Sequence, residues 1–412
     1  MFTDRLKVTK LNWLYFDLDS YFATIEQHLN PALRHKPIVI LPLMSDYTCA
    51  IAASFEAKQL GIKTGTKIHE AKKLCPDLIC IQARPDVYTK YHHLIFTEIN
   101  KYLCIDHIFS IDEGACLLTG NQSQKKVAMA VARQIKDGIK QNVGEYITCS
   151  IGIAPNRYLA KIATTIQKPN GITVISPEDI PNALFPLKLR ALPGIGASTL
   201  KRLEHAGVNS VEKLYQLNSN QLEAAWGSVN GKKCWYLLRG VDLPIEVIKK
   251  SAIGQSQVID PVDQEAGLAR NIVLSLILKA ARRLRAKTLY ASGIVLHITT
   301  HAGHVLKTRI KISPSNDSTL ISKTILKSWD NMVFQHNIIK VKKIAVSFVD
   351  LVAESKQLSF DDLGLVKRRQ AISSTLDKIN KQFGANAVSL GLLKPKTKKD
   401  DAIAFGHIPE GL

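Results

Sequence analysis

Short apolar runs alternate with amphipathic stretches along the first 176 residues. Residues 13–17 are an apolar run that ends in an acid, which predicts a buried strand. Residues 20–29 place Phe22, Ile25 and Leu29 on one face, which predicts a helix. The same patterns predict a helix at 53–60, a strand pair at 108–118, an amphipathic helix at 125–141 and a strand at 146–153. Elements in this order build a sheet with helices packed on it.

A boundary near Ser176-Pro177 separates this part from residues 177–243, where short predicted helices are interrupted by glycines. Residues 244–251 have the composition of a linker, and a separate small domain follows. It has the split β-α-β-β-α-β order, with strands at 252–259, 291–299, 304–312 and 341–350 and helices at 264–286 and 318–333. Residues 354–412 are a tail with a helical stretch at 367–383 and a charged segment, Lys394–Asp401, that we expect to be mobile.

The charge balance indicates a polyanionic partner. The chain has 412 residues, about three domains by length, and 46% of them are apolar, so it folds around real cores. Its net charge of +20 favours nucleic acid or a membrane surface over a neutral partner, although composition alone also fits a merely charged surface. Residues 244–350 hold 16 Lys and Arg against 7 Asp and Glu. Arg282, Arg283, Arg285 and Lys287 cluster at one helix end, where they either complement the helix dipole or contact phosphates.

Other features favour an intracellular protein without a membrane span. No apolar run approaches the ~18 residues that a spanning helix needs, and residues 1–16 lack the pattern of a signal peptide. The seven cysteines are scattered and form no matched close pairs, which argues against a zinc site. We therefore expect reduced thiols and a cytoplasmic, nucleoid-associated protein.

Three acids lie in or beside apolar runs. Asp17 ends the first predicted strand, and Asp112 and Glu113 follow Ser110-Ile111. A carboxylate in such a run is costly to bury unless it is paired or binds a metal, and oxygen ligands suit a pair of Mg²⁺ ions. Taken alone, Asp17 fits a strand-end turn and the other two fit a hairpin turn equally well. We expect the nearby Asp19 to cap the helix that starts at Ser20.

Two lysines and a glycine turn provide candidate phosphate contacts. Lys168 lies in Gln-Lys-Pro-Asn-Gly and Lys58 on the predicted helix 53–60, although a lone lysine is more often a solvated side chain. Pro193-Gly194-Ile195-Gly196 precedes a predicted helix and presents free N–H groups at its positive end. Holding a DNA phosphate in this way is typical of a helix-hairpin-helix, and an ordinary helix connection is the alternative.

In this order, the motifs resemble those of the Y-family, or translesion, DNA polymerases of bacteria, over residues 11–350. The motifs are Phe16 to Phe22, Asn30-Pro31 with Lys36-Pro37, Ser110 to Glu113, Leu159 to Ala163 with Lys168 to Gly171, and Pro193 to Gly196. The resemblance implies an α+β multidomain, right-hand polymerase. Its palm would comprise 1–28 and 88–176, its fingers 29–87, its helix-hairpin-helix thumb 177–243 and its little finger 252–350, with a tail at 351–412.

The resemblance also implies residue roles. Asp17, Asp112 and Glu113, with the Leu18 carbonyl, would hold two Mg²⁺ ions, and Phe22 would be the steric gate that excludes a ribose 2′-hydroxyl. Tyr21, Phe55, Lys58 and Lys168 would hold the dNTP triphosphate. The backbone of Gly194, Ile195 and Gly196 would contact template-primer DNA, as would Arg282, Arg283 and Arg285 in the little finger. Phe55, Lys58 and Gly114-Ala115 depart from the family pattern, which puts nucleotide affinity and rate in doubt.

The tail carries a weaker likeness. Gln357-Leu358-Ser359-Phe360 is similar to the sliding-clamp-binding peptide of bacterial polymerases, one residue shorter than its usual form. The helix that follows resembles the tail of the DNA polymerase V catalytic subunit, which implies possible accessory mutagenesis subunits. Gln357, Leu358 and Phe360 would make the clamp contacts.

The expected activity is low-fidelity, damage-tolerant synthesis of DNA, as in the SOS response, because a fingers segment of about 60 residues is too short for a large closing bundle. The rival hypothesis is a catalytically weak or inactive DNA-bound adaptor. Phe55, Gly114 and Ala115 favour the adaptor, whereas the intact acids favour the polymerase. A protein that binds RNA or a membrane surface through basic charge alone is a more distant rival, since it leaves the acids unexplained.

Overall fold

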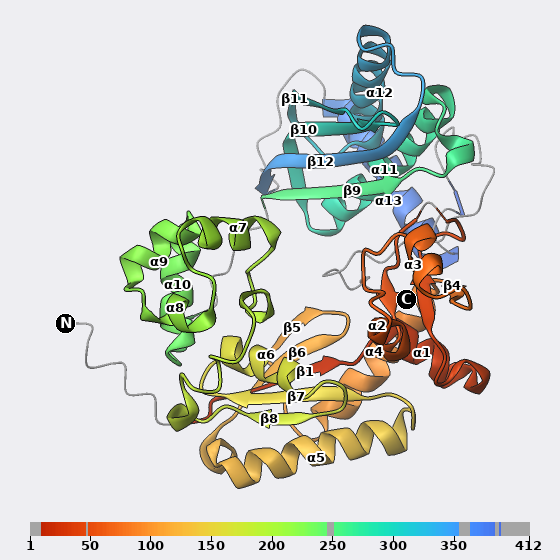
Figure 1. Cartoon of the computed structure of the whole chain (residues 1–412). Coiled ribbons are helices and arrows are strands. Elements are labelled where there is room, and N and C mark those ends of the chain that lie inside the picture. The colour runs from red at the N-terminus through yellow and green to blue at the C-terminus, as the bar shows by residue number, and fades with distance from the viewer. Residues whose placement is uncertain (1–9, 47, 245–250, 354–362, 384–386, 389–412) are drawn as a thin grey trace. The chain divides into compact units, whose positions relative to one another are not determined.

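The computed structural model describes residues 10–46, 48–244, 251–353, 363–383 and 387–388 (Figure 1). The described residues form two compact units, one up to residue 244 and one from residue 251 onward. Each unit has its own hydrophobic core, so each is described by itself.

The first unit is built on a five-stranded sheet in the order β5-β6-β1-β7-β8. Its strands are β1 (Trp13–Leu18), β5 (His107–Ser110), β6 (Glu113–Leu117), β7 (Cys149–Ala154) and β8 (Ile172–Val174). The central strand β1 pairs antiparallel with β6 and β7, and all of its residues are buried. Coverage on both faces explains why β1 is a continuous apolar run rather than an alternating one.

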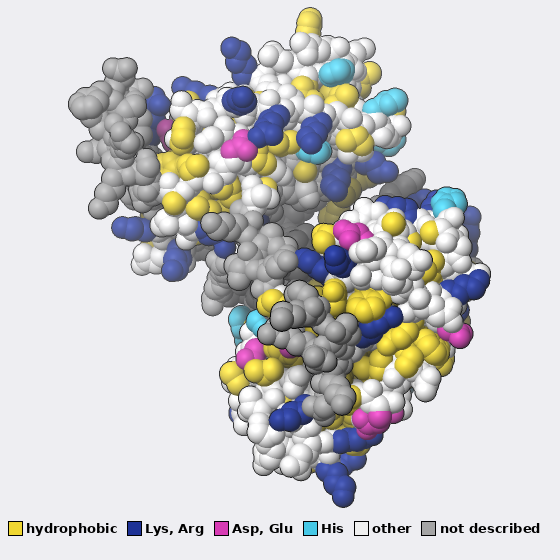
Figure 2. Space-filling model, turned by 90° about the vertical axis from the view of Figure 1, so that its left-hand side faces the viewer, with side chains coloured by type: hydrophobic (Ala, Val, Ile, Leu, Met, Phe, Trp, Pro, Cys, Tyr) yellow, Lys and Arg dark blue, Asp and Glu magenta, His cyan; other side chains and the backbone are white. Residues whose placement is uncertain are grey.

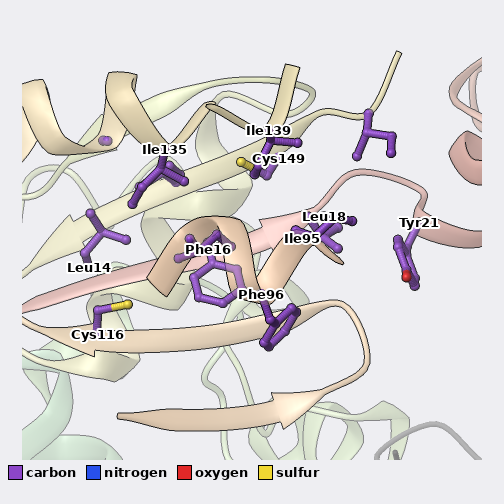
Figure 3. Packing of buried hydrophobic residues seen from close by; sticks show 14 of the residues in the cluster. Leu14, Phe16, Leu18, Tyr21, Ile95, Phe96, Cys116, Ile135, Ile139 and Cys149 are labelled. Atoms are coloured by element: carbon purple, nitrogen blue, oxygen red, sulfur yellow. The ribbon is translucent and has the colours of Figure 1, made fainter. Parts of the chain in front are cut away.

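Helices cover both faces of this sheet. They are α4 (Pro85–Asn100) and α5 (Lys125–Asn142) on one face and α6 (Arg157–Ile166) on the other, whereas α1 (Tyr21–Leu29) contacts α4 and the small sheet that includes residues 38–41. Leu14 and Phe16 of β1 pack with Phe96 of α4 and Ile135 of α5 (Figure 3). Because strand side chains alternate between faces, Trp13 and Tyr15 pack instead among residues of α6. Asp17 follows the same alternation and therefore lies on the α6 face.

Two sequence expectations change here. Helix α4 was not predicted, because its polar residues hide the apolar stripe that includes Tyr88, Ile95 and Ile99. Strand β7 begins at Cys149 rather than residue 146, because Gly144 and Ile147 form a backbone turn before it.

Residues 29–87 form a small lobe around a three-stranded sheet in the order β3-β2-β4. The strands are β2 (Ile38–Leu41), β3 (Ala52–Ala53) and β4 (Ile79–Gln82), and the helices are α2 (Phe55–Gln59) and α3 (Ile68–Leu74). The lobe has a core of its own that includes Val39, Leu41, Ala57 and Ile68. The predicted helix at 53–60 is therefore present but shorter.

Residues 177–243 are a cluster of short helices, as the sequence predicts. They are α7 (Ala197–His205), α8 (Val211–Gln216), α9 (Ser219–Trp226) and α10 (Val229–Leu238). Asn156 joins this cluster to α6: its Oδ1 accepts the Leu159 N–H at 2.8 Å and its Nδ2 donates to the carbonyls of Leu237 and Val241 at 2.8 and 2.9 Å. The Asn156 side chain is fully buried, so the joint is shielded from water.

The second unit confirms the predicted order of strands and helices. Its elements are β9 (Ala252–Val258), α11 (Ala266–Ala286), β10 (Leu289–Thr300), β11 (Val305–Ser315), α12 (Ser318–Gln335) and β12 (Val341–Ala353). The sheet order is β11-β10-β12-β9, and every pairing is antiparallel. Ile294, Leu296 and Ile298 of β10 pack into the core with residues of α11 and α12.

The last described helix, α13 (Leu363–Phe383), belongs to the second unit and begins earlier than the predicted residue 367. The described residues also contain short 3-10 helices, which are η2 (Pro31–Leu33), η3 (Gly120–Ser123), η4 (Pro177–Asp179), η5 (Leu189–Ala191) and η6 (Pro261–Asp263).

Candidate active site

Strand pairing brings the three predicted acids together at one edge of the central sheet. Asp17 of β1 lies directly opposite Glu113, the first residue of β6. Asp112 lies in the turn between β5 and β6, and its carbonyl accepts the Leu18 N–H at 2.8 Å. Asp112 is thus a hairpin-turn residue and Glu113 begins the second strand of the hairpin, which places both acids beside Asp17.

Two lysines contact these carboxylates. Lys161 of α6 forms ion pairs with Asp17 and Glu113, and Lys168, just after α6, pairs with the other oxygen of Asp17. Lys168 was predicted to contact a triphosphate, whereas no role was predicted for Lys161. The position of Lys161 on α6, over the face to which Asp17 points, is what brings it to the acids.

The two neighbouring aspartates have opposite pKa shifts. Burial works to raise the pKa of Asp17, but the ammonium groups of Lys161 and Lys168 outweigh it and lower that pKa. Burial raises the pKa of Asp112, and the negative charges of Asp17 and Glu113 raise it further against the opposing hydrogen bond from Ser110. Asp112 therefore carries an electrostatic cost that Asp17 does not.

A pocket opens beside the acids. It is lined by Asp17, Leu18, Ser20, Tyr21, Phe22, Ile51, Ala52, Ala53, Lys58, Thr64, Ile111, Asp112 and Lys168. Of the residues expected to hold a triphosphate, Tyr21, Lys58 and Lys168 line this pocket. Phe55 is not among its lining residues, and its side chain is 43% exposed.

Lys58 and Tyr21 reach the pocket in different ways. Lys58 Nζ donates to Ser20 Oγ at 2.7 Å, and burial followed by the charge of Lys168 lowers the pKa of Lys58. The Tyr21 hydroxyl instead donates to the Tyr88 carbonyl at 2.6 Å, away from any nucleotide role. Tyr21 is the first residue of α1, so what it offers an anion is a backbone N–H at a helix N-terminus.

The oxygen donors of this site suit a hard divalent cation. Carboxylate oxygens and the Leu18 carbonyl are the ligands that Mg²⁺ prefers, and the lysine ammonium groups show that cations are stable against these carboxylates. Within the described part of the chain, no group of three or more His, Cys, Asp or Glu residues has the geometry of a metal site. With Lys161 and Lys168 paired to the acids, the carboxylates are arranged around ammonium groups.

Asp19 does not cap α1, contrary to expectation. The N-cap is Ser20, with φ 49° and no side-chain cap bond. The Asp19 carboxylate accepts hydrogen bonds from Ser150 Oγ at 2.8 Å, from Thr148 Oγ1 at 3.1 Å and from the Asn170 N–H at 2.8 Å. It therefore anchors the segment that carries Lys168 to the end of β7.

Tyr15 and Gly114 complete the surroundings of the acids. Lys161 Nζ lies 5.1 Å from the centre of the Tyr15 ring, and burial followed by the Glu113 charge raises the pKa of the Tyr15 phenol. Gly114 is paired with Phe16, and a Cβ at residue 114 would lie 2.6 Å from the Phe16 ring. A larger residue at position 114 would therefore require the Phe16 ring to shift.

The glycine turn at 193–196 has the backbone expected of an anion-binding loop. Gly194 has φ 89°, which a larger residue adopts only with strain, and Gly196 is the N-cap of α7 without a side-chain cap. Gly194 and Gly196 are exposed, whereas Ile195 is buried against the thumb core. At Ile195, a phosphate could therefore contact the backbone but not the side chain.

The arginine cluster of the second unit is engaged within the protein. The Arg285 guanidinium pairs with Asp377 of α13 through two hydrogen bonds of 2.6 and 2.9 Å and also donates to Asn316 and Ser318. Arg282 lies 3.5 Å from the same carboxylate, and Arg283 donates to the Gly254 carbonyl at 3.0 Å. With its side chain 12% exposed, Arg285 is a structural residue, contrary to the prediction that it contacts DNA.

A different basic row is exposed. Along β11, Lys307, Arg309 and Lys311 alternate with Leu306, Ile310 and Ile312, which pack against the core. The three basic side chains therefore lie on the face opposite α11 and α12, where Arg309 pairs with Asp350. The Lys-x-Arg-x-Lys spacing in the sequence could have revealed this row. Lys and Arg side chains greatly outnumber Asp and Glu on the face drawn in Figure 2.

Gln357, Leu358 and Phe360 lie outside the described residues, as does Lys394–Asp401. No helix in the described part of the chain has the length and apolar character needed to cross a membrane.

Three segments match family models. Residues 16–165 match the impB/mucB/samB family, residues 190–242 the DNA polymerase-iota thumb domain, and residues 250–360 the C-terminal domain of the impB/mucB/samB family. DNA polymerase IV of Saccharolobus solfataricus is 30% identical over 267 residues, which cover 64% of this chain and 70% of that protein. The chain belongs to the Y family of DNA polymerases. DNA polymerase IV 1 of Bacillus subtilis is 27% identical over 409 residues, 95% of each chain.

A solved Y-family DNA polymerase chimera superposes with a TM-score of 0.70 at 24% identity, covering 83% of this chain and 100% of the chimera. The insertion ternary complex of Dbh DNA polymerase covers the same shares with a TM-score of 0.55. These likenesses confirm the α+β multidomain polymerase fold, with a helix-hairpin-helix thumb and a little finger. As a Y-family member the protein is a translesion DNA-directed DNA polymerase, and the family implies dependence on a divalent metal.

Proposed function

We propose that Asp17, Asp112 and Glu113, together with the Leu18 carbonyl, hold two Mg²⁺ ions for nucleotidyl transfer from a dNTP to a primer 3′-hydroxyl. When bound, two such ions activate the attacking hydroxyl and stabilise the leaving pyrophosphate. The observation that carries the proposal is the pairing of Asp17 with Glu113 beside Asp112, at the edge of a pocket that two lysines also line.

The chain's own groups then orient the nucleotide. Lys168 and Lys58 neutralise the triphosphate, and the N–H of Tyr21 adds a donor at the start of α1. Lys161 shields the repulsion between Asp17 and Glu113 and keeps the pair in place. The lysine at position 58 acts as a point charge, because it lacks the bidentate geometry of arginine.

Phe22 would be the steric gate. Its ring lines the pocket and is 4% exposed, so it occupies space that a ribose 2′-hydroxyl would need. Exclusion by an apolar wall of this kind discriminates by roughly 10- to 200-fold for a small added group.

Template-primer DNA would be held by its backbone. The glycine turn at 193–196 offers N–H groups to one phosphate, and the β11 row of Lys307, Arg309 and Lys311 offers charge to others. We assign DNA contact in the little finger to this row in place of the Arg282, Arg283 and Arg285 cluster.

We also propose a fidelity, binding partners and a cellular location for the protein. The small lobe of residues 29–87 leaves a pocket that accepts distorted bases, so synthesis is of low fidelity during damage bypass in the SOS response. The peptide at 357–360 would bind a sliding clamp, and accessory mutagenesis subunits would bind the tail. We place the protein in the cytoplasm at the nucleoid.

Single-nucleotide incorporation with Mg²⁺, opposite an undamaged base and an abasic site, tests the proposal. We expect incorporation on both templates and a loss of at least about 100-fold for Glu113→Gln. Asp106→Asn is the matched control, because the Asp106 carboxylate accepts the backbone N–H of Leu117 at 2.7 Å and does not line the pocket. Tight template-primer binding without incorporation of any nucleotide would support the adaptor hypothesis instead.

A further inference from the structure

The Phe22 ring rests on a second aromatic ring. Its centroid lies 4.4 Å from that of Tyr88, and the two planes are inclined by only 14°. Tyr88 is fully buried and is not among the residues that line the pocket, so it supports Phe22 from the core side. Whatever fixes the Tyr88 ring therefore also fixes the depth to which the Phe22 ring enters the pocket.

Tyr88 is held at both its hydroxyl and its backbone. The hydroxyl donates to Glu26 Oε1 at 2.8 Å, and the carbonyl accepts the Tyr21 hydroxyl at 2.6 Å. Glu26 is 3% exposed and lies one turn after Phe22 on α1, so the network ties α4 to the helix that carries the gate.

Arg84 completes the network. Its Nε donates to Glu26 Oε1 at 3.0 Å and its Nη2 pairs with Glu26 Oε2. A buried carboxylate needs such partners, because leaving it unpaired is costly. Burial and then the Glu26 charge raise the pKa of Tyr88, so the phenol stays protonated and continues to donate at neutral pH.

We infer that Tyr88, held by Glu26 and Arg84, is a positioning residue that fixes the Phe22 ring and so sets how strictly the polymerase excludes ribonucleotides. The inference rests on the proposed role of Phe22 as the gate. It adds a specificity network whose members do not line the pocket and do not contact the nucleotide.

The test is steady-state incorporation of a matched dNTP and rNTP by the full chain. For Tyr88→Ala, we expect the rNTP kcat/KM to rise by roughly tenfold. Loss of the supporting ring should weaken discrimination by about as much as the loss of one small group from an apolar pocket wall. The dNTP kcat/KM should change by less than about threefold. Tyr88→Phe keeps the ring and loses only the bond to Glu26, so a rise of about threefold is expected.

Tyr102→Phe is the matched control. Its hydroxyl also donates to a buried glutamate, Glu98, at 3.1 Å, whereas the ring stacked on Phe22 is that of Tyr88. It should leave the ratio of rNTP to dNTP use unchanged. A merely structural role for Tyr88 would instead lower both kcat/KM values together.

A double variant distinguishes a failure of the Tyr88 network from a failure of the gate assignment for Phe22. Phe22→Ala alone should accept rNTPs, and adding Tyr88→Phe should then have no further effect, because the two residues act through one ring. If Phe22→Ala relaxes sugar selection while Tyr88→Ala and Tyr88→Phe both select like wild type, the positioning network is refuted and the gate stands. If Phe22→Ala itself selects like wild type, the gate assignment is wrong and the network falls with it.

Discussion

The acids of the first unit and the arginines of the second are both groups of like charge, but the acids come from distant positions in the sequence and the arginines are neighbours on one helix. Strand pairing sets Asp17, Asp112 and Glu113 at the edge of a pocket. Helix packing instead turns Arg285 toward Asp377, a partner 92 residues away along the chain, and leaves it largely buried. A group of like charges can therefore line a pocket or stabilise the fold, according to which residues pack against it. Activity tests the first case, and the free energy of unfolding tests the second.

The largest expected effect is catalytic. Asp112→Asn should reduce nucleotide incorporation by at least about 1,000-fold, because it removes an oxygen ligand from the proposed metal site. Single-turnover primer extension with Mg²⁺ measures this loss. Activity within about tenfold of wild type would place the metal site elsewhere.

The next effect concerns stability. Arg285→Ala should lower the unfolding free energy of the second unit by about 3 kcal/mol, because it leaves the Asp377 carboxylate without its principal partner. Arg270→Ala is the matched control: the Arg270–Asp330 pair has side chains that are 42% and 52% exposed, and it should cost under about 1 kcal/mol. Calorimetry of the full chain separates the two. A variant as stable as wild type but defective in DNA binding would restore Arg285 to the DNA surface.

A smaller effect distinguishes the two aspartates. The raised pKa of Asp112 means that its contribution to stability is present at low pH and is lost as pH rises through the folded value. Asp112→Asn should therefore raise the melting temperature of the first unit at pH 7 in EDTA, by about 2 °C.

Asp17→Asn should have the opposite sign. Its lowered pKa contributes stability above the ordinary carboxylate value, which is lost as pH falls, and its removal leaves Lys161 and Lys168 without that charge. A fall of about 3 °C under the same conditions is expected. Shifts of the same sign for both variants would contradict the assignment of opposite pKa shifts.

The smallest effect sharpens the DNA surface. Lys307→Ala should weaken template-primer binding a few-fold and reduce the slope of log Kd against log salt by about one, as for a single phosphate contact. Fluorescence anisotropy over a salt series measures the slope. An unchanged slope for Lys307→Ala and Lys311→Ala would remove the β11 row from the interface.

Periodicity and motif order were enough to predict the main strands, the order of elements in the second unit and the proximity of the three acids. Local patterns could not predict contacts that depend on packing between distant segments. Lys161 meets Asp17 only because α6 crosses the face to which that strand residue points, and Asp19 finds Ser150 and Asn170 only through the β1–β7 pairing. Tyr88 was not predicted because the helix that carries it has too many polar residues to show a clear apolar face.

The buried Asn156 amide has a consequence for motion. One end of its side chain starts the helix that carries Lys161, and the other end holds two carbonyls of the helical cluster at 177–243. If that cluster rotates as DNA advances, it must either carry α6 with it or break those hydrogen bonds. A single amide therefore links movement of that cluster to the helix of Lys161, whose ammonium group pairs with Asp17 and Glu113.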